Sequence, residues 1–132
     1  MDRAVNFYEL KQELANLGFH DAGLVNELRT AIAGDELEHH LYTQLAVGAE
    51  QAEFALAYRR DREGRFSLYC IECSMDIPGR SGSQWFHNFL PGVPAAEAIE
   101  LVSLQLDYRD DDPFMPLSRQ ETQELITTLK TT

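Results

Sequence analysis

Two cysteines three residues apart are the first candidates for chemistry. Cys70 and Cys73 have the C-x-x-C spacing of zinc and redox sites. They lie in a strand-like run, however, and residues three apart in a strand point to opposite faces. The sequence has no second cysteine pair to complete a four-thiolate zinc site. The pattern therefore predicts two ordinary, partly buried thiols, which behave as small hydrophobic side chains.

Histidines and aspartates are the other candidate metal ligands. His39 and His40 are neighbours in a strand-like run, so their rings are expected to face opposite ways. The run Asp110–Asp112 offers oxygen ligands, but it lacks the spacing and the closing glutamate of a calcium loop. The sequence also lacks a serine-nucleophile elbow and a phosphate-binding glycine loop. We therefore predict no catalytic residue, no metal site and no cofactor.

Positive charge is concentrated in one part of an acidic chain. The 132 residues include 22 acidic and 11 basic side chains, which give a net charge of −11. Five of the 11 basic residues lie within 22 positions: Arg59, Arg60, Arg62, Arg65 and Arg80. We interpret the first four as the turn of a hairpin that contacts an anionic partner surface through bidentate hydrogen bonds. The alternative is a solvated turn whose charges discourage pairing between sheet edges.

Aromatic residues suggest a second contact surface. Trp85 and Phe86 stand in a short apolar run with Phe89, and Tyr69 precedes them in the hairpin. Trp and Tyr often anchor interfaces, so Trp85 and Phe86 are predicted to line a pocket or a partner groove. The alternative is that they belong to the core, and the sequence leaves open whether they are buried or exposed.

The elements that must position these residues begin with two helices. Apolar residues recur at helical spacing from Phe7 to Leu17 and again from Leu24 to Ile32. Asn6 is predicted to cap the first helix, with Glu9 as its capping-box partner. Glycines at positions 18 and 34 follow the two stripes and are expected to end the helices.

A change of period marks the strands. From Leu37 to Val47 apolar residues alternate with polar ones, which predicts a strand with one buried side. The runs 52–58 and 66–75 flank the polar, arginine-bearing turn and predict a hairpin. Residues 83–90 form a further strand or one flank of a groove. Breaker residues in 77–82 predict a loop before it.

The C-terminal part is predicted to be helical. Pro94 suits the first turn of a helix that continues through Val102. Residues 104–108 continue that helix or begin a short strand, and the sequence does not decide between them. Ser118 and Glu121 form an S-x-x-E capping box before a last helix.

These elements predict one α+β domain over residues 1–132. It has two N-terminal helices, an antiparallel meander of three to four strands and two C-terminal helices. A hydrophobic content of 44% and the chain length are typical of a domain that folds on its own core.

Residues 6–14 are followed by Leu17-Gly18-Phe19, a second helix and a meander of strands. In these features the N-terminal part of the chain resembles a group of small, acidic, uncharacterised Bacteroidetes proteins. It implies a bacterial cytoplasmic protein and transfers no catalytic residue, because the group has no assigned activity.

Composition and missing motifs favour an interaction protein. We expect a non-enzymatic protein–protein interaction or adaptor module whose partner is another protein, in a process that the sequence does not name. The net charge disfavours direct binding to nucleic acid or to an anionic membrane. No apolar run is long enough to span a membrane, and no export signal opens the chain, so we expect a cytoplasmic protein with free thiols. The sequence does not indicate the oligomeric state.

Two other functions remain open. One is an acidic decoy that inhibits a nucleic-acid-binding protein. The other is a small enzyme that uses Cys73, His87 or residues 107–112 in an unrecognised pocket.

Overall fold

A computed structural model describes residues 2–76, 82, 84–104 and 114–131. These residues form four helices and four strands. In chain order the elements are α1 (Arg3–Leu17), α2 (Ala22–Ala33), β1 (Glu38–Val47), β2 (Glu50–Arg60), β3 (Phe66–Asp76), β4 (Gln84–Phe89), α3 (Ala95–Leu104) and α4 (Arg119–Lys130). The predicted α+β class is confirmed, with four strands in the meander. The undecided segment after Leu104 lies outside the described residues, as do Arg80 and the Asp110–Asp112 run.

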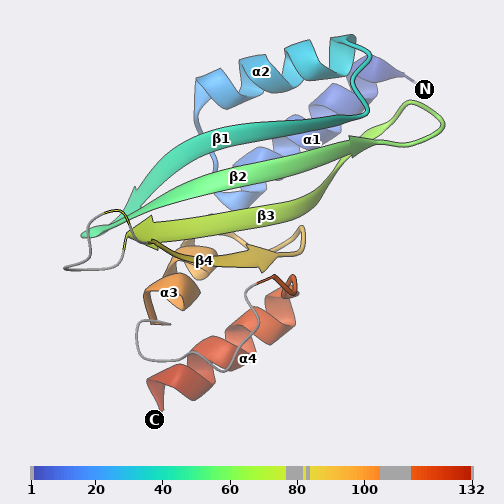
Figure 1. The fold of residues 1–132 in the computed structure, drawn as a ribbon. Helices are drawn as coiled ribbons and strands as arrows, with labels where there is room; N and C mark the ends of the chain where they lie inside the picture. Colours follow the sequence, from blue (N-terminus) through green and yellow to red (C-terminus); the bar gives the residue numbers. More distant parts are fainter. Residues whose placement is uncertain (1, 77–81, 83, 105–113, 132) are drawn as a thin grey trace.

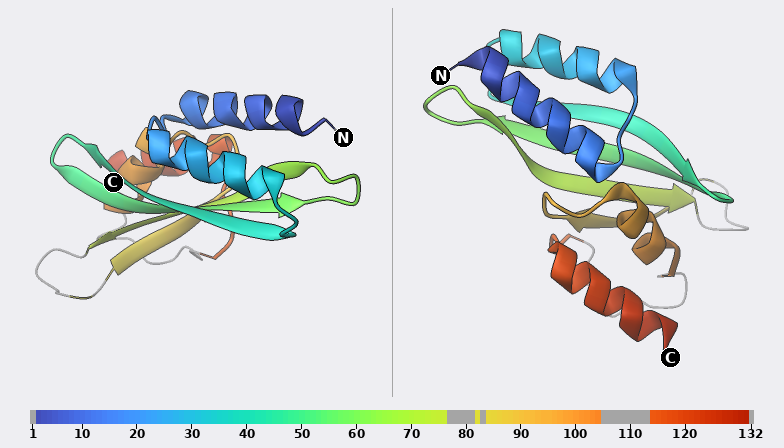
Figure 2. Two further views of the ribbon diagram at one scale, coloured as in Figure 1. Left: turned by 90° about the horizontal axis from the view of Figure 1, so that it is seen from above. Right: turned by 180° about the vertical axis from the view of Figure 1, so that it is seen from behind.

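The strands form one antiparallel sheet in the order β1-β2-β3-β4, so each strand pairs with its neighbours in the sequence (Figure 1). Helices α1 and α2 lie against one face of this sheet (Figure 2). Helix α3 packs against β2, β3 and β4, and its first residue, Ala95, lies beside Gly18 at the end of α1. No helix among the described residues covers the opposite face, which we call the open face.

The core lies between the helices and the covered face of the sheet. Leucines of α1 and α2 meet Leu41, Phe54, Leu56 and Ile71 from the strands, and all of these residues are buried. Phe19 follows α1 and packs edge-on against Phe54, with ring centroids 5.0 Å apart. The alternation that the sequence showed in each strand therefore produces one apolar and one open face.

A β-bulge between β2 and β3 keeps the apolar side chains of β3 on the covered face of the sheet. The register between β2 and β3 shifts between Ala57 and Tyr58, and Tyr69 is the additional residue on β3. Leu68 on one side of the bulge and Ile71 on the other are therefore both buried on the covered face.

The start of α1 differs from the prediction. Asp2, and not Asn6, is the N-cap, and its side chain accepts hydrogen bonds from the main chain of Ala4 and Val5. Asn6 lies inside the helix and is buried. Its amide donates to the Phe66 carbonyl at 3.0 Å and accepts from the Phe66 N–H at 2.9 Å. Asn6 thus attaches α1 to the first residue of β3. Loss of such a bond leaves a buried backbone group unpaired, at about 1–3 kcal/mol each.

The C-terminal helix attaches to α3 rather than to the sheet. The predicted capping box is confirmed, because Ser118 and Glu121 exchange side-chain and main-chain hydrogen bonds. Arg119 forms an ion pair with Glu97, and Lys130 forms one with Glu100. None of the described helices has the length and apolar character needed to cross a membrane.

Candidate functional site

The Arg60 side chain is engaged by the end of helix α2. It is the last residue of β2, and its guanidinium lies over the Phe66 ring at 4.2 Å from the centroid. It donates hydrogen bonds of 3.0–3.4 Å to the main-chain carbonyls of Ala31, Ile32, Gly34, Glu36 and Gly64. Ala31 and Ile32 belong to the last turn of α2, where carbonyls lack the N–H partners of the helix interior, and Gly34 is the C-cap residue. Arg60 therefore holds the C-terminal end of α2 against the hairpin.

The other three arginines of the hairpin lie on the surface. Arg59 approaches Glu38 at 3.7 Å and stacks on a tyrosine ring of β3 at 4.3 Å. Arg65 forms an ion pair with Glu9 at 2.6 Å. Arg62 is exposed and makes no hydrogen bond or ion pair with any described residue. Partner binding at this turn stays a prediction, and Arg62 is its most available side chain.

Trp85 and Phe86 face opposite sides of β4. Both are partly buried. Trp85 packs against the core. Phe86 lies on the open face and packs against Phe114, with ring centroids 5.1 Å apart. Of the two, Phe86 is therefore the one that contributes to an aromatic pair on the open face.

Cys70 and Cys73 point to opposite faces of β3, as the sequence predicted. Cys73 stands across from His87 in the β3–β4 register, and both side chains are fully buried. Burial, with a smaller contribution from the charge of Glu72, raises the pKa of the Cys73 thiol to about 12. The thiol therefore stays protonated at neutral pH and lacks the thiolate that a nucleophile needs.

The two adjacent histidines also separate. His39 contacts Glu36 at 2.9 Å, whereas His40 lies near Tyr42 on the open face, with ring centroids 6.3 Å apart. Within the described ranges, no group of three or more His, Cys, Asp or Glu side chains is arranged to hold a metal ion.

The outer edge of β1 is the feature that best fits a binding site. β1 is ten residues long and stands at the end of the sheet (Figure 1). On its outer side it pairs with no strand or loop of the described chain. Such an edge presents a row of unpaired N–H and C=O groups.

The register identifies the backbone groups that point outward. The Arg60 N–H donates to the Leu37 carbonyl at 2.8 Å, and the β1–β2 register then continues without a shift. In an antiparallel ladder, residues that exchange hydrogen bonds alternate with residues that do not. Leu37 and every second residue after it therefore face β2. The outward N–H and C=O groups belong to the alternate set, which is Glu38, His40, Tyr42, Gln44 and Ala46.

A hollow lies on each side of this edge. Between α2 and β1 is a cavity of about 320 Å³, lined by Asn26, Glu27, Thr30 and His39. On the other side is a hollow of about 360 Å³, lined by Tyr42, Thr43, Gln44, Glu53 and Phe54. Successive side chains of an added strand would point alternately toward these two hollows. We call the edge and the two hollows the β1 groove.

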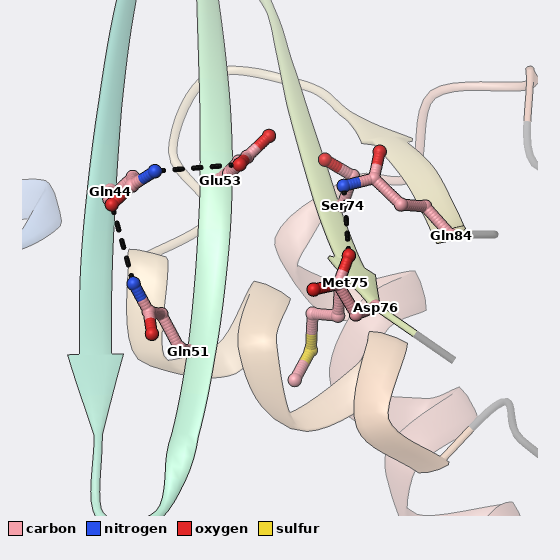
Figure 3. Close-up of a pocket in the computed structure, with 7 residues that line it drawn as sticks. All are labelled: Gln44, Gln51, Glu53, Ser74, Met75, Asp76 and Gln84. Atoms are coloured by element: carbon pink, nitrogen blue, oxygen red, sulfur yellow. Dashed lines mark hydrogen bonds between the residues drawn. The ribbon is translucent and has the colours of Figure 1, made fainter. Parts of the chain in front are cut away.

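A third hollow extends the site over the open face (Figure 3). Its volume is about 240 Å³, and it is lined by Gln44, Gln51, Glu53, Ser74, Met75, Asp76 and Gln84. Gln51 donates to Gln44 at 3.3 Å, and Gln44 donates to Glu53 at 3.4 Å. Gln84 donates to Asp76 at 3.2 Å. Amides and carboxylates therefore continue from the β1 groove across the sheet.

The β1 groove is acidic. Residues 21–53 include seven acidic side chains and one basic side chain, Arg29. The Arg29 guanidinium lies over the Phe7 ring at 4.8 Å, and no Lys or Arg lines any of the three hollows. This part of the surface therefore favours a cationic ligand over an anionic one.

Two features of the sequence indicate an unpaired edge at this strand, although the sequence analysis did not predict it. The first strand of a meander has only one neighbour in the sequence, so it stands at an edge unless another segment pairs with it. Residues 38–47 contain no Lys and no Pro, which commonly protect such edges.

Comparisons of the chain with protein-family models, with curated proteins and with solved structures found no match.

Proposed function

We propose that this chain is a non-enzymatic protein-interaction module that binds an extended, basic segment of a partner protein as a fifth strand along β1. The observation that carries the proposal is the unpaired ten-residue edge of β1 with a hollow on each side. Strand addition to an exposed sheet edge derives affinity from main-chain hydrogen bonds and specificity from hollows that receive alternate side chains.

Charge supports a basic partner. The groove carries Glu27 on α2 and Glu53 on β2, and neither forms an ion pair with a described residue. Lys or Arg at alternate positions of an added strand would lie near these carboxylates. An acidic segment would meet like charges there and on the rest of a chain of net charge −11.

A synthetic decapeptide in which Lys or Arg alternates with Val or Thr tests the proposal. Titrated into the ¹⁵N-labelled protein, it should slow hydrogen exchange at the amides of His40, Tyr42 and Gln44, because these N–H groups gain acceptors. A decapeptide with Glu in place of Lys and Arg should not do so. If the basic peptide leaves these three amides unprotected, strand addition at β1 is wrong.

Two substitutions separate a local charge effect from the net charge. Glu27→Lys changes a side chain of the groove, and Glu124→Lys makes the same change in net charge on the exposed surface of α4. We expect Glu27→Lys to weaken peptide binding at least about tenfold, and Glu124→Lys to weaken it much less. Equal weakening by both would support the acidic-decoy function instead, in which the whole acidic surface is the ligand.

We also propose that the protein acts in a bacterial cytoplasm. Cys70 and Cys73 are free thiols on opposite sides of β3, which supports a reducing cytoplasm. The resemblance of the N-terminal part to small acidic Bacteroidetes proteins supports a bacterial source.

A further inference from the structure

A cavity separate from the β1 groove lies between α1 and the N-terminal ends of α3 and α4. Its volume is about 430 Å³. It is lined by Glu9, Gln12, Glu13 and Asn16 of α1, by Pro94 before α3 and by Arg119 at the start of α4, among others. The lining thus combines charged and amide groups with apolar surface.

Glu13 is the one charged side chain of this lining without an ion-pair partner among the described residues. Glu9 is paired with Arg65 at 2.6 Å. Arg119 donates to both carboxylate oxygens of Glu97, at 3.2 and 3.3 Å. The Oε1 atom of Glu13, in contrast, is buried and accepts no hydrogen bond from the described chain.

A second buried polar group lies close to Glu13. The Tyr58 hydroxyl has no hydrogen-bond partner among the described residues, and the side chain is 1% exposed. Burial and the nearby charge of Glu13 both raise the pKa of Tyr58. Tyr58 does not line the cavity, whereas Glu13 does. Buried polar atoms in folded proteins are nearly always paired, so the unpaired Glu13 oxygen at the cavity points to a ligand that would pair with it.

We propose that this cavity binds a short-chain organic amine, whose ammonium group donates hydrogen bonds to Glu13 and neutralises it. A cation is favoured because buried charges are stable when they are paired, and the other charges at the cavity already have partners. The methylene groups of the ligand would pack on Pro94 and on Leu17, which also lines the cavity.

The pH dependence of binding has a defined sign. Burial raises the pKa of Glu13 above its usual value. The charged or titratable groups around it are Glu9 on the same helix and Arg119 on α4, which line the same cavity, and Tyr58 on β2, which interacts with its charge. Only ionised Glu13 pairs with an ammonium group, so affinity should rise as the pH increases through the raised pKa. Without ligand, the same shift makes ionised Glu13 destabilising, and this loss of stability grows over the same pH range.

Titration with n-butylammonium chloride, followed by NMR of the ¹⁵N-labelled protein at pH 8, tests the proposal. We expect saturable shifts at α1 and Gly92, and a loss of affinity of at least about tenfold in Glu13→Gln. Glu27→Gln makes the same change in charge at the β1 groove and should leave amine binding unchanged. Without ligand, Glu13→Gln should unfold at a temperature no lower than the native protein at pH 8, so its loss of binding does not reflect misfolding.

Three results would overturn this inference. They are absence of saturable binding by the native protein, equal binding of n-butanol, and undiminished binding by the folded Glu13→Gln variant. Because Glu13 does not line the β1 groove, Glu13→Gln should also leave binding of the basic decapeptide intact, which keeps the two proposals separable.

Discussion

The two edges of the sheet differ in whether another segment of the chain covers them. β4 is six residues long, and the segment before α4 lies along it. There the Leu90 N–H donates to the Leu117 carbonyl at 2.8 Å, and the Leu117 N–H donates to the Asn88 carbonyl at 3.2 Å. β1 is ten residues long and has no such cover within the described chain. Since an open edge invites pairing, this difference is the reason why we propose strand addition at β1 and not at the covered β4 edge.

The surroundings of the two edges differ as well. The cover of β4 carries the apolar side chains of Phe114 and Met115, which are 68% and 63% exposed. The β1 groove is lined mainly by polar and acidic side chains, with Tyr42 as its large exposed aromatic residue. An apolar edge would favour self-association, whereas the acidic β1 edge of a chain of net charge −11 repels a second copy. This difference in charge supports our proposal of a basic partner at β1 over pairing with a second copy of the chain.

The largest expected effect comes from the support of α2, the helix that forms one wall of the β1 groove. Arg60→Met removes five hydrogen bonds to main-chain carbonyls at and after the end of α2, and in the hairpin turn. We expect a loss of about 2–3 kcal/mol in the free energy of unfolding, measured by urea denaturation. Hydrogen exchange at the C-terminal end of α2 should accelerate, while the amides of β4 and Leu90 should change less.

Arg62→Met is the matched control. It removes the same charge two residues further along, from a side chain without a described partner, and should change stability by no more than about 0.5 kcal/mol. Equal effects of the two substitutions would contradict the distinction between a structural Arg60 and an exposed Arg62.

A smaller effect is expected where the β4 edge is covered. Leu117→Pro removes the N–H group that donates to Asn88, and should lower the free energy of unfolding by about 1–2 kcal/mol. Leu117→Ala keeps this N–H while it loses the apolar contacts, so the difference between the two variants isolates the hydrogen bond. Faster hydrogen exchange at Leu90 in the proline variant alone would show that this hydrogen bond closes the β4 edge. Identical exchange at Leu90 in both variants would show that the hydrogen bond does not close this edge.

Local patterns predicted the elements because the forces that form them are local. The alternation from Leu37 to Val47 and the capping box of Ser118 and Glu121 need only neighbouring residues, and both are present in the structure. The role of Asn6 could not be predicted from local patterns. Its spacing to Glu9 is typical of a cap, but its partner is Phe66, 60 residues away, and no local pattern indicates such a contact.

The candidate site was missed for the same reason. Arg59, Arg60 and Arg65 form a conspicuous cluster in the sequence, yet their partners are a glutamate of β1, the end of α2 and a glutamate of α1. A charge pattern does not show whether the charges are already paired by tertiary contacts. The edge of β1 consists of backbone groups, which every sequence contains, and it becomes a site only through the absence of a pairing strand.

The smallest expected effect on stability is also the sharpest test of the open edge. Proline at position 42 removes an N–H that points outward and makes no ladder hydrogen bond, so Tyr42→Pro should lower the free energy of unfolding by less than about 1 kcal/mol. Thr43→Pro removes an N–H that faces β2, and should cost at least about 2 kcal/mol. Urea denaturation compares the two, and equal losses would mean that the outward assignment is wrong. Because Tyr42→Pro keeps the fold, its loss of binding to the basic decapeptide would report directly on the edge of β1.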